Sequence, residues 1–356
     1  MEEKFELPIH IEDVDSVTDC WIYNRLAIIK TSPYYKDWIA SHYNLHVNSG
    51  YNFHFGDVSI YQPAYHEEIL QRRPVKLFDL GKDNIVTILK EFLESGYYVI
   101  MHVKQYKEHN YFHEVLFYGF DNSKEAFMCV GLHNRIFQRM FLEYTYMENT
   151  IKEIQQHFLI DDHLGMHLAL NFQYPVTVAK LNPNFKPHNC VFEAFLKLKQ
   201  ELNGELHEVC GLPDFADYSS ASYVYRGISC LYAFKQMLEK EIKGEEFVSG
   251  FRGISSAAKK ILEHRRMLYC SMEYILENWA DAMTDYARTS ATEYRKCNLT
   301  AEKWLNMCLK YEQTQDKDLL KRIAKEVPEV FSKEKKCLEH FIYDGIDWHK
   351  FNKNYI

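Results

Sequence analysis

The sequence lacks the features that mark a membrane or secreted protein. No window is long and apolar enough to cross a bilayer. The N-terminus, MEEKFELPIHIEDVD, is acidic and has no apolar stretch of signal-peptide length. The net charge of −8 gives no basic field for nucleic acid or for an anionic membrane. We therefore expect a cytoplasmic protein with no nucleic-acid partner and no membrane association.

Several common catalytic and metal-binding motifs are also missing. The nine cysteines are an odd number without a Cys-x-x-Cys pair, which favours free thiols over a disulfide framework or a zinc ribbon. There is no Gly-rich phosphate loop and no Gly-x-Ser-x-Gly elbow. Histidine pairs four residues apart lack the glutamate of a zincin motif. We expect no metal site, and the alternative position for one is near His42, His46 and His54.

The residues that are present describe an ordinary globular protein with two halves. The 356 residues are 47% hydrophobic and 26% charged, which suffices for a large core. Helix and strand patterns alternate from about residue 18 to 180, whereas helical patterns dominate from about residue 185. The sequence therefore predicts an α+β domain with an antiparallel sheet over residues 1–184 and an α-helical domain over residues 185–356.

The periodicity also predicts individual elements. In the first half we predict helices over 20–32, 83–96 (closed by Gly96) and 142–158, strands over 97–106 and 168–180, and a hairpin over 113–132 with the turn DNSK. In the second half we predict helices over 190–202, 227–242, 253–287 and 300–314, with Pro328 and Ser332 separating the last two helical pieces.

One cysteine and one histidine occupy positions suited to nucleophilic catalysis. Cys20 begins a predicted helix after the polar run DVDSVTD, where free N–H groups and a partial positive charge stabilise a thiolate. His113 heads the apolar run HEVLFYGF, and alternation places its side chain on the face of Val115, Phe117 and Gly119. An ionisable ring there is either a core or rim histidine with a hydrogen bond, or a general base for Cys20. A cysteine that opens the first helix and a histidine that opens a later strand is the order of papain-like enzymes.

Longer segments resemble a known family. DCWIYNRLAII, GYNFHFG and SGYYVIMHVKQYKEHNYFHEVLFYGFDNSKEAFMCVGL look like parts of the N-terminal domain of the butirosin biosynthesis protein H family. That domain is similar to the bacteriocin-processing papain-like peptidases. The most specific match is the strand Val99–Val103, the polar loop Lys104–Phe112, His113 and the turn Tyr118–Asp121. Motifs carry the resemblance over roughly residues 15 to 180, and only architecture carries it beyond.

The resemblance implies a papain-like domain that transfers an acyl or peptidyl group from a carrier-protein thioester to an amine, which forms an amide in antibiotic biosynthesis. Cys20 would take the acyl group and His113 would deprotonate the amine acceptor. No cofactor is expected on this chain, because phosphopantetheine arrives on the acyl or peptidyl carrier protein. The basic clusters QRRPVK and EHRR are either solvated faces or docking points for an acidic carrier protein. The helical domain either covers the acyl channel or forms a homodimer interface.

The chain departs from the family pattern in two places. Where the return strand of the hairpin usually ends with an Asp that orients the histidine, this chain has Gly131, and Asn134 is the nearest residue able to take that role. The Gln that papain-type peptidases place before the cysteine is absent, so backbone N–H groups, Ser16 or Thr18 would bind the oxyanion. Two alternatives stay open: a thioesterase or peptidase that uses the same Cys–His pair, and a non-catalytic papain-fold binding protein.

Overall fold

The computed structural model divides the chain into two compact units. The sheet unit comprises residues 1–35 and 58–186, and the helical unit comprises residues 36–57 and 187–356. The structure describes residues 3–12, 20–42, 45–48, 51, 53–55, 69–75, 80–81, 83–104, 112–133, 136–160, 176–187, 190–204, 223–245 and 253–355.

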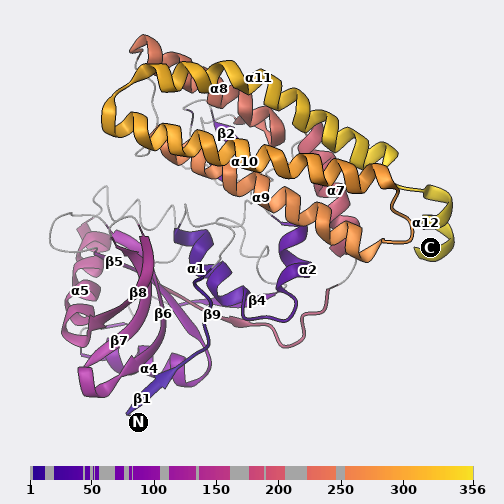
Figure 1. The fold of residues 1–356 in the computed structure, drawn as a ribbon. Coiled ribbons are helices and arrows are strands. Elements are labelled where there is room, and N and C mark those ends of the chain that lie inside the picture. Colours follow the sequence, from indigo (N-terminus) through magenta and orange to yellow (C-terminus); the bar gives the residue numbers. More distant parts are fainter. Residues whose placement is uncertain are drawn as a thin grey trace. The chain divides into compact units, whose positions relative to one another are not determined.

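The sheet unit is built on a seven-stranded sheet (Figure 1). Its neighbouring strands are antiparallel in every pair that the structure describes. Its order is β4 (Leu70–Pro74), β9 (Val176–Leu181), β5 (Tyr98–Lys104), β6 (Phe112–Asp121), β7 (Ala126–His133) and β8 (Ile136–Glu143), and β1 (Lys4–Glu6) pairs with the end of β6. The hairpin of β6 and β7, closed by the turn η3 (Asn122–Lys124), confirms the predicted hairpin.

Helices cover both faces of this sheet. On one face, α4 (Ile85–Glu94) and α5 (Tyr144–Ile160) pack in one core with strand residues such as Val103 and Val115. On the other face lies α1 (Cys20–Ile29), because Asn24 and Arg25 bond to the side chain of Glu114, which alternates with that of Val115. These helices confirm the three predicted for this half, and Gly96 follows α4 with a φ of +80°.

The alternation of β6 does not continue to its end. The register shifts between Phe117 and Gly119, so that Phe117 and Phe120 face the same core. A Cβ atom at Gly119 would lie 2.4 Å from the backbone oxygen of Phe5. The predicted placement of Gly119 on the face of His113 is therefore wrong. The register shift interrupts the alternation before Gly119, and β1 lies close to its backbone.

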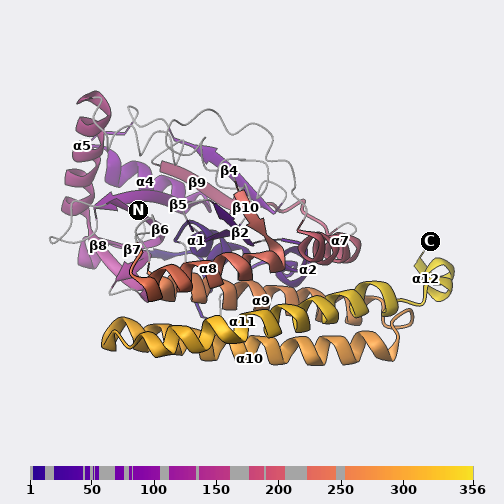
Figure 2. The same cartoon turned by 90° about the horizontal axis from the view of Figure 1, so that it is seen from above.

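The helical unit consists of long helices that lie side by side (Figure 2). Its elements are α2 (Tyr35–Ala40), β2 (Leu45–Asn48), β3 (Phe53–Phe55), α7 (Cys190–Asn203), β10 (Tyr223–Arg226), η4 (Gly227–Ser229), α8 (Cys230–Lys243), α9 (Ile254–Asn278), α10 (Asp285–Thr314), α11 (Lys317–Glu339), the π-turn η5 (His340–Asp344) and α12 (Trp348–Tyr355). A small sheet of order β10-β2-β3 accompanies the helices.

The segment 36–57 belongs to the helical unit, which differs from the single domain predicted over 1–184. Three buried side chains of the helices bind its backbone. Lys260 donates to the Phe53 oxygen at 2.5 Å, Ser271 donates to the Ala40 oxygen at 2.6 Å, and Lys197 donates to the His42 oxygen. These contacts join residues far apart in the sequence, so no local sequence pattern predicts them.

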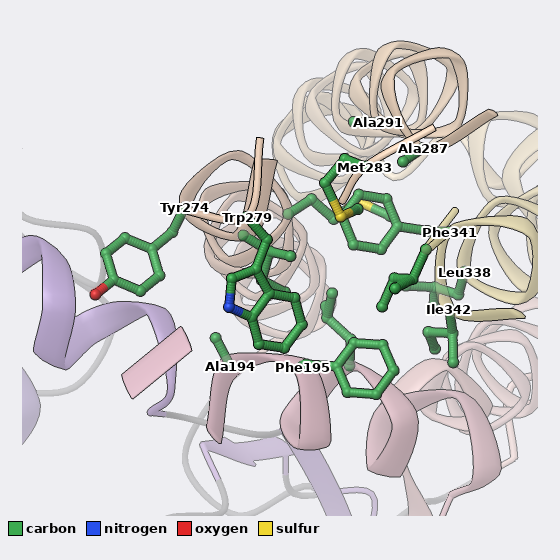
Figure 3. Close-up of a cluster of buried hydrophobic side chains, with 14 of the residues drawn as sticks. Ala194, Phe195, Tyr274, Trp279, Met283, Ala287, Ala291, Leu338, Phe341 and Ile342 are labelled. Carbon is green, nitrogen blue, oxygen red and sulfur yellow. The ribbon is translucent and has the colours of Figure 1, made fainter. Parts of the chain in front are cut away.

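Two predicted helix boundaries are wrong. The break between α9 and α10 lies at residues 279–284, inside the predicted helix 253–287, because Trp279 and Met283 are buried in the core and continue the apolar period across the turn (Figure 3). The predicted separation at Pro328 and Ser332 is absent, since α11 runs through both residues. The buried face of α11, which includes Val327, holds the helix together there.

Candidate active site

Cys20 is the first residue of α1. The first N–H groups of a helix have no partner inside the helix, and they are available to a thiolate or to an oxyanion. The following turns are apolar and buried, with Ile22, Leu26 and Ile29 all fully enclosed. This buried face fixes the helix that carries Cys20 on the sheet.

A buried polar cluster fastens α1 to β6. The Arg25 guanidinium binds both carboxylate oxygens of Glu114, at 2.8 and 3.3 Å. The Asn24 amide donates to the Glu114 backbone oxygen at 3.3 Å and to its Oε1 at 3.1 Å. Glu114 follows His113 directly, so the cluster ties the helix of the candidate nucleophile to the strand of the candidate base.

The start of α1 points toward the start of β6. Glu114 lies opposite His102, near the end of β5, whereas Thr31, just after α1, lies close to Tyr98 at the beginning of β5. Cys20 precedes Asn24 by four residues, which is about 6 Å along the helix axis, on the same side of the helix. Cys20 therefore lies at the end of the sheet where His113 begins the predicted strand.

His113 occupies the opposite face of β6 from α1. It is the second residue of β6 and pairs with Val103, a member of the core under α4 and α5. Directly opposed residues of antiparallel strands share a face, so the half-buried His113 ring lies on the side of Val103 and Val115. The structure places Cys20 and His113 at the same end of the sheet, but α1 lies on one face and the His113 ring on the other. A contact between the two residues therefore has to go around the first residue of β6.

The expected orienting position holds no side chain. Gly131 lies opposite Gln138 in β8, and a Cβ atom there would meet Met140 Sδ at 3.1 Å and Val115 Cγ2 at 3.2 Å. Packing therefore fills the place where a carboxylate is expected. Asn134, the alternative orienting residue, lies outside the described residues.

Glu114 is the charged centre of the α1 face, and His102 lies opposite it. Both are buried, and they are register partners in β5 and β6. Burial is the strongest influence on the pKa of Glu114 and raises it. The charges of Arg25 and His102 and the hydrogen bonds from Arg25 and Asn24 outweigh burial, so the pKa lies below its ordinary value. Glu114 is therefore an ionised carboxylate in an otherwise apolar interface.

A helix start alone does not distinguish Cys20 from other cysteines. Cys190 and Cys230 also begin helices, α7 and α8, and both are buried. The Cys230 thiol donates to the Leu45 oxygen at 3.3 Å, and burial raises its pKa well above the ordinary value. This cysteine is a small core residue, which makes it a matched control for Cys20.

Other described thiols are also held in the protonated form. Burial raises the pKa of Cys297 and Cys308 to about 12 and that of Cys337 to about 11, and it raises the pKa of Cys129 further. These four groups are protonated at neutral pH and are poor nucleophiles.

The histidines near residue 42 have structural roles or lie outside the description. The His42 ring stacks on Trp38 at 4.1 Å, and its Nδ1 lies 2.5 Å from the Trp38 oxygen. Burial is the main cause that lowers the pKa of His42 to about 3. His46 and His54 are register partners in β2 and β3. Throughout the described part of the chain, no three His, Cys, Asp or Glu side chains gather in a metal-binding arrangement.

No protein-family model and no curated protein sequence matches the chain. Within the described ranges, no helix combines the length and apolarity that crossing a membrane requires. Support for the site therefore comes from its residues and their geometry.

The cluster of Asn24, Arg25 and Glu114 was not among the residues predicted from the sequence. Its signal was present, because Asn24 and Arg25 interrupt an apolar helix and Glu114 interrupts an apolar strand. Polar residues that interrupt apolar runs in two elements are candidates for a buried pair.

Proposed function

We propose that this chain is a cysteine-dependent acyltransferase with a papain-like sheet unit, which forms an amide from a carrier-protein thioester and an amine in natural-product (antibiotic) biosynthesis. The observation that carries the proposal is the attachment of α1 to β6. Asn24 and Arg25, which follow Cys20 by four and five residues, bind Glu114, which directly follows His113. An N-terminal helix on an antiparallel sheet, with a cysteine at its first residue, supports the papain-like assignment.

The reaction has two acyl transfers. In the first, the Cys20 thiolate attacks the thioester carbonyl, the bond from that carbon to the carrier sulfur breaks, and protonated His113 gives its proton to the leaving thiolate. In the second, an amine attacks the Cys20 thioester, His113 takes a proton from the nitrogen, and the Cys20 sulfur leaves as a thiolate. The first N–H groups of α1 stabilise the oxyanion in both steps.

The donor is proposed to be an acyl or peptidyl carrier protein, in a reducing, cytoplasmic setting. Arg73 of β4 supports the docking part: it is exposed, and its guanidinium lies 5.4 and 5.6 Å from the ring centres of Phe92 and Tyr97. An Arg73→Glu variant is expected to slow acylation by an acidic carrier protein and to leave acylation by a small thioester unchanged. If Arg73→Glu is acylated at the wild-type rate by both donors, Arg73 is not part of the docking surface.

The test is intact-protein mass spectrometry after incubation with short-chain acyl thioesters. We expect an acyl adduct on the wild type and on Cys230→Ala, and none on Cys20→Ala. Adduct on Cys20→Ala would refute the nucleophile. Addition of amines then separates transfer from hydrolysis, because a thioesterase or peptidase loses the adduct to water at an amine-independent rate.

The base is tested with two histidines on neighbouring strands. His113→Gln is expected to slow acylation by about a hundredfold or more, whereas His102→Gln is the matched change on the opposite face of the sheet. If His102→Gln abolishes acylation and His113→Gln does not, the general base is His102, on the face of the sheet that α1 covers.

A non-catalytic binding protein is the second candidate, and specific observations favour it. His113 faces away from α1, and Gly131 offers no orienting carboxylate. This candidate predicts no adduct on the wild type with any thioester, including one on a carrier protein, and ordinary reactivity of Cys20 toward alkylating agents.

A further inference from the structure

The interface between α1 and the sheet contains a charged pair at a place where apolar packing would cost less desolvation free energy. Burying two charges costs several kcal/mol of desolvation each, and replacing such a pair by apolar residues of similar volume is often neutral or stabilising. Arg25 and Glu114 are nonetheless both buried here, among fully enclosed neighbours such as Ile22 and Leu26. Stability alone does not explain the pair.

We propose that Glu114 is a positioning residue for Cys20: it fixes the first turns of α1 against β6, and its charge balances that of Arg25 in the helix that Cys20 begins. The proposal rests on the function proposed for Cys20 and goes beyond it, because it assigns a role to a buried carboxylate outside the proposed Cys20–His113 pair.

The positioning part follows from the number and direction of the bonds. Arg25 binds both Glu114 oxygens, which fixes the distance and the rotation of the helix, and Asn24 adds a bond to the backbone of the strand. Cys20 and Asn24 lie on one side of α1, about one turn apart. Since a misplacement of about 1 Å at a reacting group can cost about a hundredfold in rate, a loosened helix slows acylation.

The charge part concerns the groups that face Glu114. These are Arg25 and Asn24 from α1 and His102 from β5. Removing the carboxylate charge leaves the positive charge of Arg25 unbalanced, five residues after Cys20 in the same helix. The thiolate of Cys20 is then favoured, so the pH midpoint of its alkylation moves down, by about half a unit or more at an effective dielectric constant near 20.

The experiment measures two quantities on each variant: the pH midpoint of Cys20 alkylation by iodoacetamide, read by peptide mapping, and the rate of acylation by a small acyl thioester. Glu114→Gln is expected to lower the midpoint and to slow acylation by about tenfold or more. Glu114→Asp keeps the charge with a shorter reach, so we expect an unchanged midpoint with slower acylation.

Glu334→Gln is the matched control, because Glu334 forms the same kind of buried pair with Arg265 in the helical unit. It is expected to lower the melting temperature and to leave both Cys20 quantities unchanged. If Glu114→Gln behaves like Glu334→Gln, with lower stability and an unchanged midpoint, Glu114 is only structural and the proposal is overturned.

A double variant keeps the test decisive if Glu114→Gln does not fold. Arg25→Met combined with Glu114→Leu removes both charges, and we expect a wild-type midpoint with slow acylation. Wild-type acylation in a folded double variant would contradict the positioning role. Alkylation needs no acyl donor, so an absence of acylation in the wild type would refute the proposed function while the midpoints still report on Glu114.

Discussion

The two units of this molecule bury the same kind of ion pair in different settings. In the helical unit, Arg265 of α9 binds Glu334 of α11, with both side chains almost completely enclosed. In the sheet unit, Arg25 of α1 binds Glu114 of β6, at the end of the sheet where Cys20 begins α1 and His113 is the second residue of β6. The first pair joins two helices inside a core, whereas the second joins the two elements that carry the candidate chemistry.

The cysteines sharpen the contrast. In the helical unit, Cys230, Cys297 and Cys308 are buried and their thiol pKa values are raised, so burial removes their reactivity. Cys20 instead begins a helix beside a charged cluster. A buried pair or a cysteine at a helix start is therefore informative only together with what surrounds it.

The largest expected effect is on the buried pair of the helical unit. Arg265→Met leaves Glu334 as a buried carboxylate without its arginine, and we expect the free energy of unfolding to fall by about 3–5 kcal/mol. Urea denaturation measures this change. Lys321→Ala, which breaks an exposed pair with Asp318, is the control and should leave the midpoint unchanged. A loss below about 1 kcal/mol for Arg265→Met would mean that the pair is not sealed from water.

Two glycines, one in each unit, allow a matched comparison of backbone strain. Gly227 has a φ of +54°, and a Cβ there would lie 2.3 Å from the Glu201 oxygen, whereas Gly96 has a φ of +80° and open space around it. We expect Gly227→Ala to cost at least about 2 kcal/mol and Gly96→Ala about 1 kcal/mol. Thermal unfolding of the two variants gives the order, and equal losses would show that Glu201 moves aside.

Acid should affect the helical unit first. His42 has its pKa lowered to about 3, so the unfolded chain takes up a proton below about pH 6.5 that the folded chain does not. Stability from this group is present above pH 6.5 and falls by about 2 kcal/mol on going to pH 5. His42→Phe, which keeps a ring on Trp38, should flatten this slope in urea titrations between pH 7 and 5. An unchanged slope would show that another group takes up the proton.

The smallest effect is expected at Glu114, at lower pH. Its pKa is lowered, so its contribution is present above the unfolded value of 4.5 and is lost as the pH falls through the folded value. Glu114→Gln should therefore change the pH dependence of stability below pH 4.5 and not between pH 7 and 5. A change confined to the higher range would show that a group other than Glu114 titrates.

Local patterns predicted much of the sheet unit. α1, α4, β5 and the β6–β7 hairpin follow from apolar periods and turn residues that lie next to one another in the sequence. The segment 36–57 could not be placed this way, because Lys197, Lys260 and β10 hold it from far along the chain. The break at Trp279 was missed because its buried side chain continues the helical period through the turn.

The candidate site was predictable in part. Cys20 at a helix start and His113 at a strand start are local features, and the structure has both elements where the sequence put them. Which face of β6 receives α1 depends on tertiary packing, so the position of His113 on the face away from α1 could not be read in advance. The role of Glu114 needed its partners Asn24 and Arg25 in space.

The central proposal is that Cys20 is an activated thiol, in contrast to the buried thiols that the structure describes. The most direct measurement is limited alkylation of the folded wild-type protein with iodoacetamide at pH 7, followed by peptide mapping of every cysteine against time. The account predicts that Cys20 is modified at least about ten times faster than Cys230 and the other buried thiols. Modification of Cys20 at the rate of an ordinary exposed thiol, or after another cysteine of this chain, would contradict it.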